Sequence, residues 1–108
     1  MVQRFGSVVK IKPDGWEKYK AYHANPLPGV NEMIKACHLK NYSIYRRGDY
    51  MFSYYEYDGE DYEADMAKMA ADPVTQEWWD MVIPLMQKLD DHNGDGVWSE
   101  MEEVYHLE

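Results

Sequence analysis

The chain begins with apolar and small residues at every second position. Between residues 4 and 12, one face would carry Phe5, Ser7, Val9 and Ile11, and the other face the residues between them. This period of two predicts a β-strand. Pro13 and Asp14 then interrupt the alternation, so the strand is expected to end there.

A helical spacing follows from about Gly15. Trp16, Tyr19 and His23 stand at positions i, i+3 and i+7, which share one face of a helix. Residues 24–29 contain two prolines and a glycine and cannot continue that helix. A loop is therefore predicted directly after His23.

The remaining elements follow from the same two periods. They are a helix from Val30 to Cys37, strands over 41–46 and 50–57 joined by a turn at 47–49, a helix around 62–69, a helix from about Val74 that Pro84 disturbs, and a last strand over 98–107. Val104 and Tyr105 are expected to be the strongest part of that last strand.

The order strand, helix, strand, strand, helix, strand is the split βαβ pattern of ferredoxin-like α+β folds. Such a fold covers one face of a four-stranded antiparallel sheet with helices and leaves the other face open. Aromatic residues alternate along the middle strands, so a second subunit is expected to cover the open face. We predict one domain over residues 1–108, paired as a homodimer into a dimeric α/β barrel.

Composition narrows the class of partner. A net charge of −9 disfavours nucleic acid, because phosphates would be repelled. No apolar run approaches the roughly 20 residues of a membrane helix, and the first residues lack a signal-peptide core. The single cysteine, Cys37, lies on an apolar helical stripe and is expected to be a buried thiol, which fits the cytoplasm.

The chain has four histidines, and one of them is placed for chemistry. His38, His92 and His106 are expected to be structural or exposed. His23 stands one helical turn after Tyr19 and just before a loop that could form a pocket wall. An imidazole with a pKa of about 6.5 can act as both general acid and general base near neutrality. A capping or surface role for His23 is the alternative.

The adjacent Trp78 and Trp79 are a second indication of a ligand site. Neighbouring helical residues point about 100° apart, so one indole can pack in the core while the other flanks a cleft. An indole can stack on the C–H face of a sugar and donate its N–H to a hydroxyl. Two core tryptophans are the alternative. Asn41 and Tyr42 at the start of a strand add an amide and a phenol, which could equally be a strand cap and core packing.

An acidic segment near the end resembles a calcium-binding loop. Residues 91–102 place acidic or amide side chains at positions 1, 3 and 5, a glycine at 6 and a glutamate at 12. Helices should flank such a loop, whereas a terminal strand is predicted from Trp98 onward. We therefore expect a flexible acidic turn and no metal.

Several stretches together resemble the L-rhamnose mutarotase family over nearly the whole chain. They are Gln3-Arg4-Phe5-Gly6, Tyr19 to His23, Asn41-Tyr42-Ser43-Ile44, Tyr55-Glu56-Tyr57, Glu63-Ala64-Asp65-Met66, Ala71 to Gln76, Trp78-Trp79 and Met101 to Leu107. The resemblance implies a cofactor-free enzyme of ferredoxin-like dimeric fold that interconverts the anomers of L-rhamnose. It also implies that His23 is the proton donor and that Tyr19, Tyr42, Trp78 and Trp79 bind the sugar.

One departure from the family leaves alternatives open. The family often has a Trp-Pro pair after the histidine, where this chain has Leu27-Pro28. A lost aromatic wall would suit a different 6-deoxyhexose, and L-fucose is the main competitor. A haem-degrading or cofactor-free monooxygenase of the same dimeric fold is a second alternative, and a calcium- or sugar-binding module is a third.

Overall fold

An antiparallel sheet forms one layer of the molecule in the computed structural model, which describes residues 2–108. Its long strands are β1 (Gln3–Ile11), β2 (Leu39–Arg47) and β3 (Tyr50–Tyr57), in the order β2-β3-β1. The free edge of β1 pairs with two short strands, β4 (Met86–Gln87) and β5 (Ser99–Met101). This is the strand order of a ferredoxin-like sheet with its fourth strand divided in two, and the predicted fold class is confirmed.

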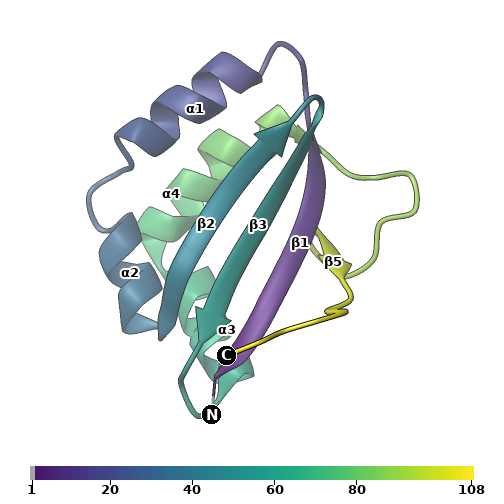
Figure 1. Ribbon diagram of the computed structural model, residues 1–108. Coiled ribbons are helices and arrows are strands. Elements are labelled where there is room, and N and C mark those ends of the chain that lie inside the picture. The colour runs from purple at the N-terminus through teal and green to yellow at the C-terminus, as the bar shows by residue number, and fades with distance from the viewer. Residues whose placement is uncertain (1) are drawn as a thin grey trace.

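All four helices lie on one face of this sheet (Figure 1). They are α1 (Trp16–Ala24), α2 (Val30–Ala36), α3 (Tyr62–Ala71) and α4 (Pro73–Val82), and a single 3₁₀ turn (Ile83–Leu85) follows α4 around Pro84. Aspartates begin the last two helices: Asp61 accepts the Ala64 amide proton, and Asp72 accepts the amide proton of Thr75. No helix in the part of the chain that the structure describes is long and apolar enough to cross a membrane.

The strand predicted over residues 98–107 is much shorter in the structure. Only Ser99–Met101 pairs with β1, and the segment expected to be strongest lies outside it, with Val104 and Tyr105 90% and 78% exposed. The helices cover the opposite face of the sheet, so these side chains have no layer of their own chain to pack against. An apolar pattern alone therefore did not produce a strand.

The core lies between the sheet and the helices. One cluster of buried side chains is formed by Val9, Ile11, Tyr19, Val30, Met51, Trp78, Val82 and Met86. A smaller one is formed by Cys37, Leu39, Tyr57 and Met69. The expectation of a buried Cys37 thiol is confirmed. No helix of residues 2–108 covers the outer face of the sheet, and Tyr45, Tyr50 and Phe52 are exposed on it.

Candidate active site

A cavity of about 950 Å³ opens between the inner face of the sheet and helices α1, α2 and α4. Its walls are mainly aromatic and aliphatic, and its polar lining includes His23, Tyr19, Tyr42, Ser7 and Ser53. The charged side chains that line it are all basic, and no aspartate or glutamate of residues 2–108 is among them. His23 is therefore the lining side chain whose ordinary pKa lies nearest neutrality.

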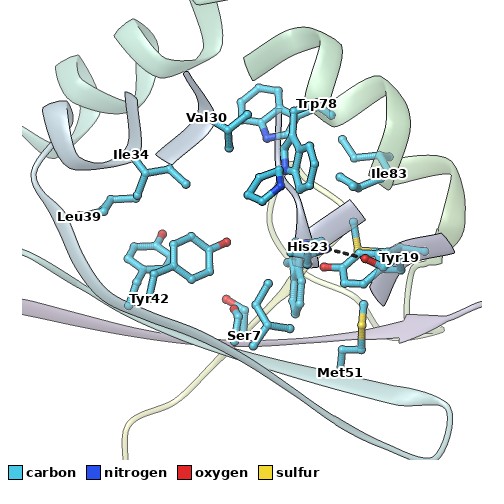
Figure 2. Close-up of a pocket in the computed structure, with 18 of the residues that line it drawn as sticks. Ser7, Tyr19, His23, Val30, Ile34, Leu39, Tyr42, Met51, Trp78 and Ile83 are labelled. Atoms are coloured by element: carbon cyan, nitrogen blue, oxygen red, sulfur yellow. Dashed lines mark hydrogen bonds between the residues drawn. The ribbon is translucent and has the colours of Figure 1, made fainter. Parts of the chain in front are cut away.

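His23 is held by the helix that carries it. Its Nδ1 lies 2.8 Å from the backbone carbonyl oxygen of Tyr19, one turn earlier (Figure 2). A carbonyl oxygen can only accept, so Nδ1 carries the hydrogen and Nε2 is the nitrogen left for a ligand. The His23 side chain is exposed toward the open cavity, yet burial by the surrounding protein lowers its pKa, against the opposing effect of the Tyr19 hydrogen bond. The neutral imidazole is thus favoured at pH 7.

Two aromatic rings fix the plane of the imidazole. The Tyr19 ring stacks on it at a centroid distance of 4.2 Å, and the Trp78 ring meets it edge-on at 5.0 Å. Burial raises the pKa of Tyr19, and the nearby Tyr42 adds to this effect, so the phenol stays protonated and can donate a hydrogen bond. Tyr19 and His23 share a helix face, as their spacing predicted, and Trp78 of α4 contacts the same imidazole.

Tyr42 reaches the cavity because β2 is irregular. The register of β2 against β3 shifts between Lys40 and Ser43, and Asn41 has a φ of 51°, a left-handed conformation that asparagine tolerates. The Asn41 amide donates to the Glu56 carboxylate at 3.0 Å and so holds this bulge. Both Asn41 and Tyr42 line the cavity, and the Tyr42 ring tilts against Tyr55 at 5.3 Å. Asn41 also shapes the backbone that carries Tyr42.

The two adjacent tryptophans divide as the 100° geometry suggested, although both line the cavity. Trp78 is 8% exposed and belongs to the larger buried cluster. Trp79 is only partly buried and contacts both clusters. Trp78 therefore combines core packing with contact to His23, and Trp79 has the more accessible ring.

A group of aromatic residues at one end of the cavity was not predicted from the sequence. Phe5 stacks between Tyr55 and Tyr62 at centroid distances of 5.1 and 4.7 Å. The hydroxyls of Tyr55 and Tyr62 lie 2.6 Å apart in a hydrogen bond, which connects α3 to the ring behind Tyr42. The alternation of residues 50–57 contained the signal, because it places Met51, Ser53, Tyr55 and Tyr57 on one face.

The other histidines of the described chain do not line this cavity. His38 lies in a separate small pocket, where its Nδ1 is 3.1 Å from Asp65. In the acidic segment, the Asn93 side chain accepts the Glu100 amide proton at 2.6 Å, so the third position of the calcium-like pattern holds the loop closed. No group of three or more potential metal-ligating side chains is found within residues 2–108.

The fold and the cavity define a ferredoxin-like protein with a histidine-containing, aromatic site for a small molecule. The family model for L-rhamnose mutarotase matches residues 4–107. An L-rhamnose mutarotase of Listeria monocytogenes is 30% identical, with 98% of this chain and 99% of the relative aligned. The chain belongs to the L-rhamnose mutarotase family.

Solved structures agree on the fold. The crystal structure of an L-rhamnose mutarotase from Formosa agariphila superposes with a TM-score of 0.76 at 22% identity, covering 98% of this chain and 99% of that one. Tetracenomycin F2 cyclase from Streptomyces glaucescens superposes at 0.72 and 19% identity, covering 98% and 97%. A cyclase shares the architecture, so the fold alone does not determine the reaction.

Proposed function

We propose that this protein interconverts the α and β anomers of L-rhamnose and that His23 carries the proton. Family membership supports the reaction and favours L-rhamnose over L-fucose and over an oxygenase. The observation that supports His23 is the lining of the cavity, where an imidazole stands and no carboxylate of residues 2–108 could replace it as the base.

The reaction needs one proton to move between two oxygens on the same carbon. Nε2 of neutral His23 removes the proton of the anomeric hydroxyl, the C1–O1 bond becomes a carbonyl, and the C1–O5 bond breaks. The imidazolium returns that proton to O5, which leaves an open-chain aldehyde and a neutral histidine. Rotation about C1–C2 and reversal of these steps close the ring on the other face. Atoms and charge balance without a cofactor.

The surrounding groups suit this role. The hydrogen bond from Nδ1 to the Tyr19 carbonyl fixes the tautomer, and the Tyr19 and Trp78 rings limit rotation of the imidazole. Tyr19, Tyr42, Trp78 and Trp79 would bind the sugar through its C–H face and its hydroxyls. Asn41 would contribute indirectly, by holding the bulge that presents Tyr42.

We also propose that the protein is a cytoplasmic homodimer. The outer sheet face and the C-terminal segment expose Tyr45, Phe52, Val104, Tyr105 and Leu107, which is the kind of apolar patch that a second copy covers. Sedimentation-velocity ultracentrifugation should give a species of twice the 12.8 kDa chain mass. A monomer at all micromolar concentrations would contradict the dimer.

Saturation-transfer NMR tests the reaction, because it reports exchange between anomers directly. We expect catalysed exchange for L-rhamnose and slower exchange for L-fucose at equal enzyme concentration. Faster exchange of L-fucose would reassign the substrate. Exchange of neither sugar, together with a Soret band on adding haem, would favour the oxygenase.

A further inference from the structure

Two serines face each other on the inner surface of the sheet, directly beneath the helices. Ser7 on β1 is the register partner of Ser53 on β3, and both line the cavity. The neighbouring pairs on the same face are aromatic or aliphatic: Phe5 with Tyr55 on one side, and Val9 with Met51 on the other. The cavity floor therefore contains one small, polar row between two large, apolar rows.

This position is unusual for a hydroxyl. Ser53 is 5% exposed and lies on a central strand, between β1 and β2. A hydroxyl taken from water into apolar surroundings needs a hydrogen-bond partner. Thr75, which also lines the cavity, has one, because its hydroxyl donates to Asp72 at 2.8 Å. Ser7 and Ser53 line the same cavity, so an occupant of the cavity can supply a partner for their hydroxyls.

The spacing of the pair fits a single ligand hydroxyl. Side chains directly opposite each other on antiparallel strands have Cβ atoms about 4.5–5.5 Å apart. A ligand hydroxyl between them can donate to one serine and accept from the other. Figure 2 shows Ser7 on the sheet floor, on the side of His23 that faces Tyr42. A sugar ring with its anomeric carbon at His23 would extend over this floor.

We propose that Ser7 and Ser53 form a subsite that hydrogen-bonds one secondary hydroxyl of the substrate ring. The proposal rests on the proposed mutarotase function and adds the part of the site that distinguishes one 6-deoxyhexose from another. Apart from the anomeric group, such a sugar has hydroxyls only at C2, C3 and C4. L-Rhamnose and L-fucose differ in configuration at C2 and C4, so a subsite that reads either position would separate them.

The test compares serine variants with deoxy sugars. Ser7→Ala and Ser53→Ala are titrated with L-rhamnose and with its 2-, 3- and 4-deoxy analogues, following the fluorescence of the cavity tryptophans. Ser43→Ala is the matched control, because Ser43 lies in the same sheet but does not line the cavity. Each cavity variant should bind L-rhamnose roughly three- to tenfold more weakly, while the control binds normally.

The analogues make the result specific. One deoxy sugar, lacking the hydroxyl that the serines bind, should show no further loss in either variant, whereas the other two should lose affinity as L-rhamnose does. Unchanged L-rhamnose affinity in both variants, or an equal loss with all three analogues, would overturn the subsite. Wild-type protein that neither binds nor exchanges L-rhamnose would instead overturn the proposed function together with the subsite.

Discussion

Two histidines of this protein lie beside tyrosines, yet their surroundings differ in charge. The Nδ1 of His23 bonds a neutral backbone carbonyl, and its cavity is lined without carboxylates of the described chain. The Nδ1 of His38 faces the Asp65 carboxylate at 3.1 Å, in a pocket that also contains Asp58 and Asp61. Both partners orient the imidazole through Nδ1, but His23 lies in the large aromatic cavity, whereas His38 lies outside it among carboxylates. The comparison separates the histidine that we propose as proton carrier from one that we expect to be structural.

Replacing each of the two histidines by glutamine should give the largest difference in the rate of L-rhamnose exchange. We expect His23→Gln to lower the rate of L-rhamnose exchange about 100-fold or more, because glutamine cannot shuttle a proton. His38→Gln should exchange at nearly the wild-type rate. Saturation-transfer NMR at pH 7 measures both rates, and circular dichroism checks that both variants fold. Comparable losses in the two variants would remove the distinction between these sites.

The pH dependence of kcat/KM tests whether His23 is the proton carrier. Burial lowers the pKa of its imidazole from the usual value of about 6.5, so the basic form persists below that pH. We expect kcat/KM to be flat around neutrality and to fall tenfold per pH unit on an acid limb whose midpoint lies below 6.5. The folded state resists protonation that the unfolded chain accepts, so stability also declines as pH falls through about 6.5. Thermal melts at each pH separate the two effects, and a midpoint above 6.5 would contradict the assignment.

Substitutions of the two tryptophans should have smaller effects, one mainly on stability and the other mainly on sugar binding. Trp78→Phe should lower the melting temperature more, because this indole is nearly buried in the core and also meets His23. Trp79→Phe should bind L-rhamnose more weakly, with the dissociation constant raised about five- to tenfold by the loss of stacking area. Fluorescence titrations beside thermal melts measure both. Unchanged affinity in both variants would mean that the pair serves packing alone.

Sequence periodicity was sufficient to predict those elements whose structure depends on a local pattern. The alternation over residues 4–12 and 50–57 located β1 and β3, and the 100° rule divided Trp78 from Trp79. Periodicity failed to predict strands whose formation depends on contacts with the rest of the fold. The two residues of β4 are too few for a periodic signal, and Val104 and Tyr105 follow a strand pattern without a layer to cover them.

The site was predictable only in part, for the same reason. His23 and Tyr19 are four residues apart on one helix, so their contact follows from local geometry. The Ser7–Ser53 pair joins two strands, and the pairing of His38 with Asp65 spans 27 positions, so each depends on the completed fold. Nothing in the neighbouring residues of His38 indicates that a carboxylate will reach it.

The smallest effect on L-rhamnose exchange is expected from a change at Tyr57, which contacts His38 and bonds its partner Asp65. Its ring is fully buried, its hydroxyl donates to Asp65, and that hydroxyl accepts the amide proton of Asp61 at 3.0 Å. Burial, with the Asp65 hydrogen bond, raises the pKa of Tyr57 to about 12, and the bond from Tyr57 is the main cause that lowers the pKa of Asp65. The three groups therefore join the end of β3 to the start of α3.

Tyr57→Phe should lower the melting temperature by roughly 4–8 °C and leave L-rhamnose exchange near the wild-type rate. The reason is that phenylalanine fills the same buried space but leaves Asp65 and the Asp61 amide without their hydroxyl partner. Tyr54→Phe is the matched control, because it removes a tyrosine hydroxyl that also bonds a carboxylate, that of Glu56, from a ring that is less buried than Tyr57, and it should melt closer to the wild type. Scanning calorimetry and saturation-transfer NMR on the same samples measure both quantities. A variant that keeps its melting temperature but loses exchange would show that the His38 pocket acts on the sugar site, and the contrast between the two histidines would then fail.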